Sequence, residues 1–454
     1  MVAEGTAGIA AKAERAVFYL LVLLLLIAPL IMTSRIPVES GKWYVIQVGA
    51  SILLGLWLVA GLVSGNRRIR WDALSVLAVA FLGTQFLSLI GAINVWDGLE
   101  VISKQVGVLA VFLLIANVLK GTNDRNRILW AAALVGGATA IYGIAQHHGY
   151  DFFPWEEHKE VPVTRGVSFF GHATFAGSVL IMLIPLTIGL TTVTKNTAGR
   201  ILAAIIVLLM LYHLSFSGAR VATVGLFVAG LVVVGVQLAQ RVRSGSRESS
   251  PPGHRSRRIL AGLAVLLTVV AAGSAFMVRA WDVKGSDLFA IRQSSLALRF
   301  YAWETTSRMI LDNPVTGIGV GNYGVASPPY WNAIESSRYA RYGRRFFQAH
   351  NEYLEIAAEQ GLPGITVMLG LIAFALTGSY GLAQRAGSAG ERRLGWALFA
   401  AVVAICIDAT VTFSLQNPGS ALFFWMLLGL ISTNLAAEKA RVDDLIGSNK
   451  ATRA

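Results

Sequence analysis

Long apolar runs separated by short polar connections recur along most of the chain. Each run holds about 20 residues, the length that an α-helix needs to cross the ~30 Å hydrocarbon core of a bilayer. Backbone groups in lipid must be hydrogen-bonded internally, so we expect helices and not an open sheet. The pattern predicts an all-α polytopic membrane protein with about 12 transmembrane helices. The expected spans are 16–34, 43–64, 73–94, 101–119, 128–147, 172–194, 199–217, 220–240, 259–279, 362–384, 394–414 and 419–437.

The charge of the connections indicates how the helices are oriented. Alternate connections are basic, and these lie at residues 67–70, 120–127, 195–200, 241–258 and 385–393. The positive-inside rule places them and both termini in the cytoplasm. The formal net charge of +13 is therefore mainly an orientation signal, and no nucleic-acid partner is expected. A hydrophobic content of 55% with only 14% charged residues excludes an ordinary soluble domain.

Two longer segments interrupt the pattern, and both fall on the face opposite the basic connections. Residues 148–171 form the shorter one, and residues 280–361 form a large outer loop, long enough for helices of its own. A loop of this length without structure is unusual unless it is functional. The chain thus divides into nine spans with a cytoplasmic linker at 241–258 (residues 1–279), the large loop, and three spans with a cytoplasmic tail (residues 362–454).

The large loop is expected to contain two helices. The first is indicated by residues at helical spacing, namely Leu296, Phe300, Trp303, Ser307 and Ile310. Asn313-Pro314 should end it, because the residue before proline disfavours helical geometry. The second should run from about 352 to 360 and stop at Gly361. His350 stands just before it.

Three ionisable residues share the outer face in this topology: Arg220 at the end of the eighth span, and Arg299 and His350 in the large loop. Charged groups at a membrane boundary are costly without a partner, so a functional role is the first hypothesis. A planar guanidinium donates in parallel to two oxygens, and two arginines could therefore hold a pyrophosphate. The imidazole of His350 could accept a proton near neutral pH, and the dipole of the following helix would help keep the ring neutral.

Each of these residues also has a structural alternative. Arg220 could anchor its helix at the lipid headgroups. Arg299 could be a surface charge on a loop helix, and a single loop histidine is often incidental. His172 and His213, which lie in or near apolar runs, are expected to be packing residues.

Weaker candidates for substrate binding are Arg165, Tyr323, Arg338, Arg341 and Arg345. The last three belong to a run of cations and aromatic residues that could meet anionic lipid, a phosphorylated sugar or the membrane interface. Gly319, Gly321 and Gly324 spell G-x-G-x-x-G, but no strand–helix unit surrounds them, so we expect turns and not a dinucleotide site. No metal site is expected, since His350 has no second histidine at ligand spacing.

Several short motifs resemble those of the O-antigen ligase and polymerase superfamily. The clearest is His350-Asn351-Glu352-Tyr353-Leu354, followed by Glu359-Gln360-Gly361 and Gly364. The same pattern is matched upstream by Arg299 with Trp303-Glu304, Asn313-Pro314, Gly317-x-Gly319-x-Gly321-Asn322, Ser217-Gly218-Ala219-Arg220, and Arg165 with Phe169-Phe170-Gly171-His172. The resemblance covers roughly residues 150–420 and implies a membrane glycosyltransferase with a GT-C-like fold.

The resemblance also implies what the enzyme would do. It would be a metal-independent glycosyltransferase without a cofactor, in the bacterial inner membrane, with a periplasmic active site. Its donor would be a glycan on undecaprenyl pyrophosphate. In the ligase branch, which the motifs favour, the acceptor is lipid A–core oligosaccharide and the product is lipopolysaccharide. Arg220 and Arg299 would bind the pyrophosphate, and His350 would act as the general base.

Other functions compete with this interpretation. Within the superfamily, an O-antigen polymerase or a protein O-oligosaccharyltransferase would use a similar donor, and the sequence does not name the acceptor. From other classes, a solute transporter or a structural scaffold would fit a polytopic protein. Transport predicts ionisable groups near the membrane midplane, whereas the candidate residues here cluster at one face.

Overall fold

The computed structural model describes residues 2–64, 69–153, 165–244, 295–343 and 347–451, and every regular element within these ranges is a helix. Ten of the described helices are long and apolar enough to cross a membrane. They are α1 (Val2–Ile27), α2 (Val38–Ser64), α3 (Ala73–Ser88), α4 (Val95–Val118), α5 (Gly121–His147), α6 (Ala173–Val193), α7 (Thr197–Phe216), α8 (Arg220–Ser244), α14 (Glu352–Arg385) and α16 (Pro418–Ala451). The prediction of an all-α polytopic membrane protein is confirmed.

Two of the expected spans are not among these ten helices. The span expected at 394–414 corresponds to α15 (Ala389–Asp408), whose apolar stretch is shortened by charged residues in its first turns. The span expected at 259–279 lies outside the described residues.

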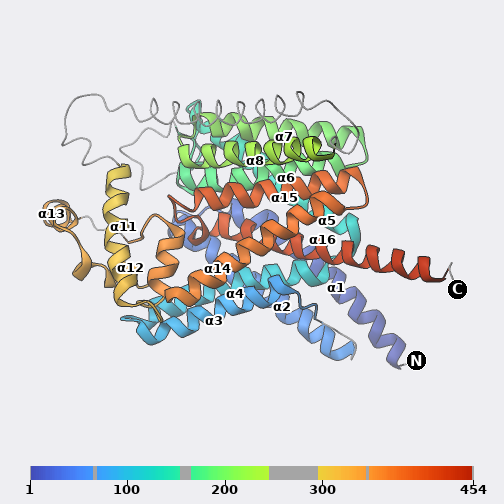
Figure 1. The fold of residues 1–454 in the computed structure, drawn as a ribbon, viewed down its shortest axis with the longest axis horizontal. Helices are drawn as coiled ribbons and strands as arrows, with labels where there is room; N and C mark the ends of the chain where they lie inside the picture. Colours follow the sequence, from blue (N-terminus) through green and yellow to red (C-terminus); the bar gives the residue numbers. More distant parts are fainter. Residues whose placement is uncertain (1, 65–68, 154–164, 245–294, 344–346, 452–454) are drawn as a thin grey trace.

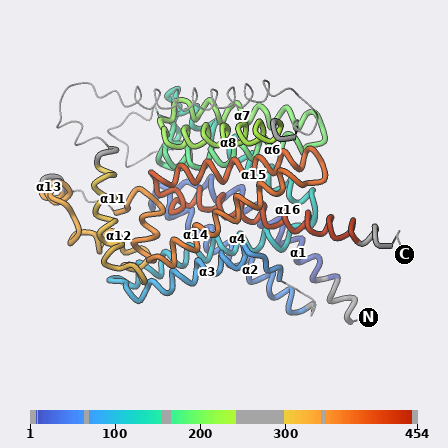
Figure 2. The backbone as a smooth tube through the Cα atoms, viewed as in Figure 1, coloured from blue at the N-terminus to red at the C-terminus, as the bar shows by residue number. Residues whose placement is uncertain are grey.

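The long helices lie side by side in one bundle (Figure 1). Both termini emerge at one end, which we call the terminal end. Three shorter helices, α11 (Ser295–Asp312), α12 (Tyr323–Ala326) and α13 (Ala333–Tyr342), lie at the opposite end, which we call the loop end (Figures 1 and 2). The termini and the three loop helices thus lie at opposite ends of the bundle, while the membrane face of each end stays a prediction.

Helices α6 and α16 form the centre of the bundle. Helix α6 and the first half of α16 are apolar on all sides, as is typical of a helix surrounded by other helices, and residues 421–428 of α16 are almost completely buried. Helix α6 packs against α7 and α15, and α16 packs against α4. The outer helices instead expose large apolar side chains, such as Ile52 and Leu62 of α2. Such a surface suits contact with lipid chains.

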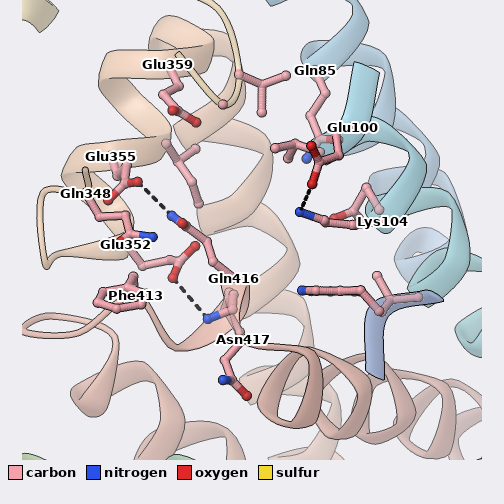
Figure 3. Close-up of a pocket in the computed structure, with 18 of the residues that line it drawn as sticks. Gln85, Glu100, Lys104, Gln348, Glu352, Glu355, Glu359, Phe413, Gln416 and Asn417 are labelled. Carbon is pink, nitrogen blue, oxygen red and sulfur yellow. Dashed lines mark hydrogen bonds and ion pairs between the residues drawn. The ribbon is translucent and has the colours of Figure 1, made fainter. Parts of the chain in front are cut away.

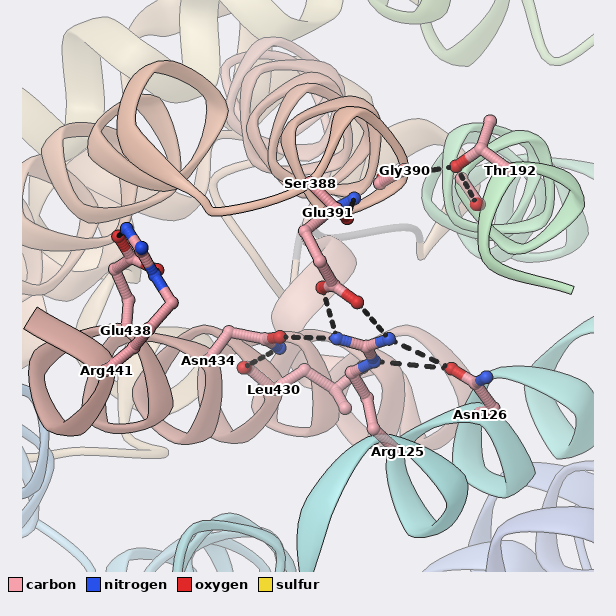
Figure 4. A network of polar contacts seen from close by, with 11 residues as sticks. Arg125, Asn126, Thr192, Ser388, Gly390, Glu391, Leu430, Asn434, Glu438 and Arg441 are labelled. Atoms are coloured by element: carbon pink, nitrogen blue, oxygen red, sulfur yellow. Dashed lines mark hydrogen bonds and ion pairs between the residues drawn. The ribbon is translucent and has the colours of Figure 1, made fainter. Parts of the chain in front are cut away.

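A partly buried ion pair joins three helices at the terminal end (Figure 4). Arg125 of α5 donates from Nη1 and Nη2 to the two carboxylate oxygens of Glu391 in α15, at 2.5 and 2.9 Å. Nη1 also donates to Oδ1 of Asn434 in α16 at 3.0 Å. A bidentate pair of this kind adds geometric specificity as well as energy. It fixes one end of α15, whose other end carries Asp408 at the loop end.

Helix α11 ends directly before Asn313-Pro314, as predicted. It does not bury the face that its apolar spacing indicates, since Phe300 of that stripe is exposed. The buried residues are Ala302, Thr305, Thr306 and Met309. This face is buried because the threonine hydroxyls have partners there: Thr305 donates to Glu335 of α13, and Thr306 bonds with the hydroxyl of Tyr323 in α12.

The segment after α11 consists of tight turns. Gly317, Gly319 and Gly321 have positive φ angles of 68°, 92° and 74°. A Cβ atom on Gly317 would lie 2.3 Å from the carbonyl oxygen of Glu359, so glycine is required where the loop approaches α14. Gly324 lies in the short helix α12. The prediction of turns is therefore confirmed at Gly319 and Gly321, whereas it is wrong for Gly324, which is helical.

Helix α14 contains the break predicted at Gly361. This residue is not helical, with φ 68° and ψ −171°, and Leu362 N donates to the carbonyl oxygen of Pro314 at 2.8 Å. Residues 352–360 thus form a separate helical segment at the loop end, while the remainder of α14 continues into the bundle.

Candidate active site

His350 precedes α14 and has a left-handed backbone conformation, with φ 52°. This conformation is uncommon for residues other than glycine, although His, Asn and Asp adopt it more often than most. The chain is held on both sides of His350. Ala349 N donates to Oε2 of Glu355 at 2.7 Å, and Glu352 N donates to the carbonyl oxygen of Ala409 at 2.9 Å. The surrounding bonds therefore determine the position of the histidine.

A row of rings connects His350 with the start of α6. The rings of His350 and Phe413 are 5.2 Å apart, those of Phe413 and Phe175 are 5.5 Å apart, and those of Phe175 and His172 are 5.2 Å apart. His172 is the N-cap of α6, and its Nδ1 accepts from Thr174 N at 3.2 Å. Although the sequence favoured a packing role for His172, the structure places it in the surroundings of His350.

The environment of His350 favours the neutral imidazole. Burial, then the Arg299 guanidinium, then His172 lower the pKa of His350 to about 4. Burial also lowers the pKa of Arg299, and the negative charge of Asp408 opposes this effect; a guanidinium nevertheless stays protonated in proteins. His350 is thus neutral at pH 7 and able to accept a proton. From the sequence we expected the dipole of the following helix to keep the imidazole neutral. In the structure, burial is the largest cause of the lowered pKa of His350.

Asp408, at the end of α15, is a site residue that the sequence analysis missed. It is fully buried, and Oδ2 accepts hydrogen bonds from Ser178 and Ser414 at 2.5 Å each and from Thr412 at 3.2 Å. Its charge acts on Arg299. We therefore regard Asp408 as a nearby negative charge that favours the protonated form of this guanidinium. An acidic residue inside an expected span was the signal that could have identified it.

Arg220 is the first residue of α8 and is exposed at the loop end. The adjacent Ala219 packs on Gly177 of α6, where an added Cβ atom would lie 2.4 Å from the Cβ of Ala219. The residue after Gly177 is Ser178, which bonds with Asp408. Arg220 therefore begins its helix near the level of the buried aspartate.

Arg165 lies beside the turn that leads into Arg220. Its Cδ is 3.7 Å from the position that a Cβ atom on Gly218 would occupy, and Gly218 has a φ of 72°. Like Arg220, Arg165 is exposed. We call Arg165, Arg220, Arg299, His350 and Asp408 the loop-end cluster. It combines fixed positive charge, suited to an anion, with a neutral base.

The remaining described candidates lie on other helices than the members of this cluster. Tyr323 is 1% exposed, its hydroxyl bonds with Thr306 at 2.9 Å, and its position therefore favours a structural role over substrate contact. Arg338 and Arg341 lie on α13, and Arg345 lies outside the described residues. His213 is buried, with Nε2 2.8 Å from the carbonyl oxygen of Gly166, as expected of a packing residue. 

Comparison with protein families identifies one matching segment. Residues 205–369 match the family model described as O-antigen ligase. No curated protein matches the chain. The matching segment includes Arg220, Arg299 and His350. The match confirms the resemblance seen in the sequence: residues 205–369 are similar to the O-antigen ligase family, which supports the O-antigen ligase and polymerase superfamily.

Proposed function

We propose that this protein is a metal-independent O-antigen ligase. It transfers a glycan from undecaprenyl pyrophosphate to lipid A–core oligosaccharide at the periplasmic face of the inner membrane. The family domain supports a function of the O-antigen ligase or polymerase type. The observation that carries the proposal is a neutral, half-buried histidine beside a guanidinium at the loop end.

The cluster can assist both halves of the transfer. As the anomeric carbon–oxygen bond to the pyrophosphate breaks, the bonding electrons remain on the leaving oxygen. Arg299 and Arg220 stabilise this developing negative charge electrostatically. The acceptor hydroxyl forms the new bond to the anomeric carbon and loses its proton to the imidazole of His350. The protonated histidine then releases the proton to the departing pyrophosphate or to solvent.

Donor binding should strengthen His350 as a base. In the free protein, the charge of Arg299 contributes to the low pKa of His350. A bound pyrophosphate would offset that charge and raise the pKa of the imidazole. A stronger base would then be available only when the donor is in place.

The pH dependence of transfer should report this change. The imidazole is active above its pKa, so kcat/KM should fall only as the pH approaches about 4, the pKa of His350 in the free protein. The acid limb of kcat should lie at higher pH, because kcat reports the pKa in the substrate complex. Steady-state transfer rates between pH 4 and 8 measure both limbs. Two coincident limbs near pH 6.5, the ordinary pKa of histidine, would contradict the proposed environment of His350.

Loss of the protein in the producing bacterium tests the function itself. A deletion strain should make lipopolysaccharide with a complete core but without O-chain, while lipid-linked glycan accumulates. Gel electrophoresis of lipopolysaccharide shows the outcome, and the wild-type gene should restore the O-chain. A single repeat unit on the core would indicate a polymerase, because ligation would still proceed. An unchanged lipopolysaccharide with altered protein glycosylation would indicate a protein oligosaccharyltransferase.

A further inference from the structure

A cavity of about 910 Å³ lies at the loop end beside the cluster. It is enclosed by α2, α3, α4, α14 and α16 and by the turn at 320–321 (Figure 3). Phe175 and Phe413, which connect His350 with His172, also line this cavity. Its volume is within the range typical of small-molecule sites. The cavity is thus separated from His350 by a single ring.

The glutamates of α14 form one wall of the cavity, and their bonds show that they are part of its framework. Glu355 accepts from Gln416 Nε2 at 2.8 Å, and Glu352 accepts from Leu415 N at 3.0 Å (Figure 3). Among the described residues, no group of three or more His, Cys, Asp or Glu side chains is placed to hold a metal ion. These carboxylates therefore fix the wall and do not converge on a cation.

Two amide side chains on the opposite wall have unused hydrogen-bonding groups. Gln85 of α3 is only 3% exposed, and within the described part of the chain its Oε1 has no hydrogen-bond partner. Nε2 of Gln105 in α4 likewise has none among the described residues. Both residues line the cavity, and Gln85 faces it in Figure 3. Buried polar atoms are nearly always bonded, so an acceptor and a donor left unused here indicate a polar ligand.

The two unused groups fit hydroxyl groups, which both donate and accept. Among the described residues that line the cavity, Lys104 is the one cation, and it is paired with Glu100 at 2.6 Å, so the lining is not suited to a phosphate. The acidic residues around it are Glu39, Asp97, Glu100, Glu352, Glu355 and Glu359. Trp43 and Trp425 add aromatic surface, against which the apolar face of a sugar ring can pack.

We infer that this cavity is a carbohydrate subsite, in which Gln85 and Gln105 bond to the hydroxyls of an unphosphorylated sugar residue next to His350. The inference rests on the proposed function and adds to it a binding site for one of the two glycans. The pyrophosphate is assigned to the arginines of the loop-end cluster, so the sugar and the leaving group occupy separate places around the histidine. The acceptor glycan and the donor glycan both offer sugar hydroxyl groups that could bond to these two glutamines.

Binding of free oligosaccharides to the purified full-length protein tests the inference. The probes are the delipidated core oligosaccharide and the O-chain repeat unit released from its lipid carrier. The variants are Gln85→Met and Gln105→Met, which keep the length of the side chain but remove its amide. Phe86→Met is the matched control, because Phe86 is half-exposed on α3 and does not line the cavity. Calorimetric titration gives Kd for each pair, and thermal unfolding gives Tm.

We expect Kd for one of the two oligosaccharides to rise about tenfold or more in both glutamine variants, and not in Phe86→Met. A rise for the core oligosaccharide assigns the subsite to the acceptor, and a rise for the repeat unit assigns it to the donor. The Tm should stay constant or increase, because an unbonded amide is replaced by an apolar group. Unchanged Kd values, or a wild-type protein that binds neither oligosaccharide, would overturn the inference.

A transfer assay on the same preparations separates this inference from the proposed function. If the wild-type protein transfers glycan but no Kd depends on Gln85 or Gln105, the subsite is wrong and the function stands. If binding depends on these glutamines but no glycan is transferred, the subsite stands and the function is wrong.

Discussion

Replacing His350 with asparagine should lower the turnover number for glycan transfer by about 10²–10⁴-fold, the usual contribution of a general base. Asparagine is a better test than alanine, because His350 has a left-handed backbone (φ 52°) that asparagine tolerates. The affinity for the lipid-linked donor should remain close to that of the wild-type protein, since we assign the pyrophosphate to the arginines. Transfer rates at saturating substrate and donor binding without acceptor measure the two quantities.

The alanine variant and a surface control complete this test. His350→Ala should be as inactive as His350→Asn and should also unfold at a lower temperature, because alanine strains the backbone. His148→Ala, at an exposed position after α5, should transfer at the wild-type rate. A His350→Asn protein that turns over normally would remove His350 from the chemistry.

The helices of this protein could be predicted from the sequence because the signal for each is local. An apolar run of spanning length identifies its own helix, and a proline or glycine marks where a helix ends. The end of α11 before Asn313-Pro314 and the break at Gly361 followed such local rules. The buried face of α11 could not be predicted in this way. Thr305 and Thr306 are buried because Glu335 and Tyr323, distant in the sequence, supply their hydrogen bonds.

The residues around His350 show the same limit: contacts between distant parts of the chain could not be predicted from local patterns. Arg220, Arg299 and His350 could be named because each stands in a recognisable motif on the predicted outer face. Asp408 ends α15 and Phe413 lies in the connection between α15 and α16, and no local pattern relates them to His350. Their role depends on α15 packing against α6 and α8, a tertiary feature. Unused hydrogen-bonding groups such as Oε1 of Gln85 are visible only once the neighbouring side chains are placed.

Replacing Arg299 with lysine should raise Kd for the lipid-linked donor about 10- to 100-fold and lower the turnover number as well. Lysine retains the charge but loses the fork that bonds two phosphate oxygens in parallel, and hydrogen bonds to charged groups contribute about 1.5–3 kcal/mol. Arg220→Lys should have a smaller effect, because Arg220 is exposed whereas Arg299 is half-buried and influenced by Asp408. Donor binding without acceptor and single-turnover transfer measure the two effects.

Two further variants of α11 distinguish the fork of Arg299 from its charge. Arg308→Lys is the control, since Arg308 is exposed and paired with Glu304 on the same helix at 2.6 Å; donor affinity should not change. Arg299→Gln removes the charge that lowers the pKa of His350, so the acid limb of kcat/KM should move to higher pH, whereas Arg299→Lys should leave it in place.

If His350→Asn abolished donor binding while Arg220→Lys and Arg299→Lys left it intact, the roles assigned here would be reversed. If both lysine variants bound donor normally and transferred at the wild-type rate, the pyrophosphate would have to bind elsewhere, because lysine cannot reproduce a bidentate contact.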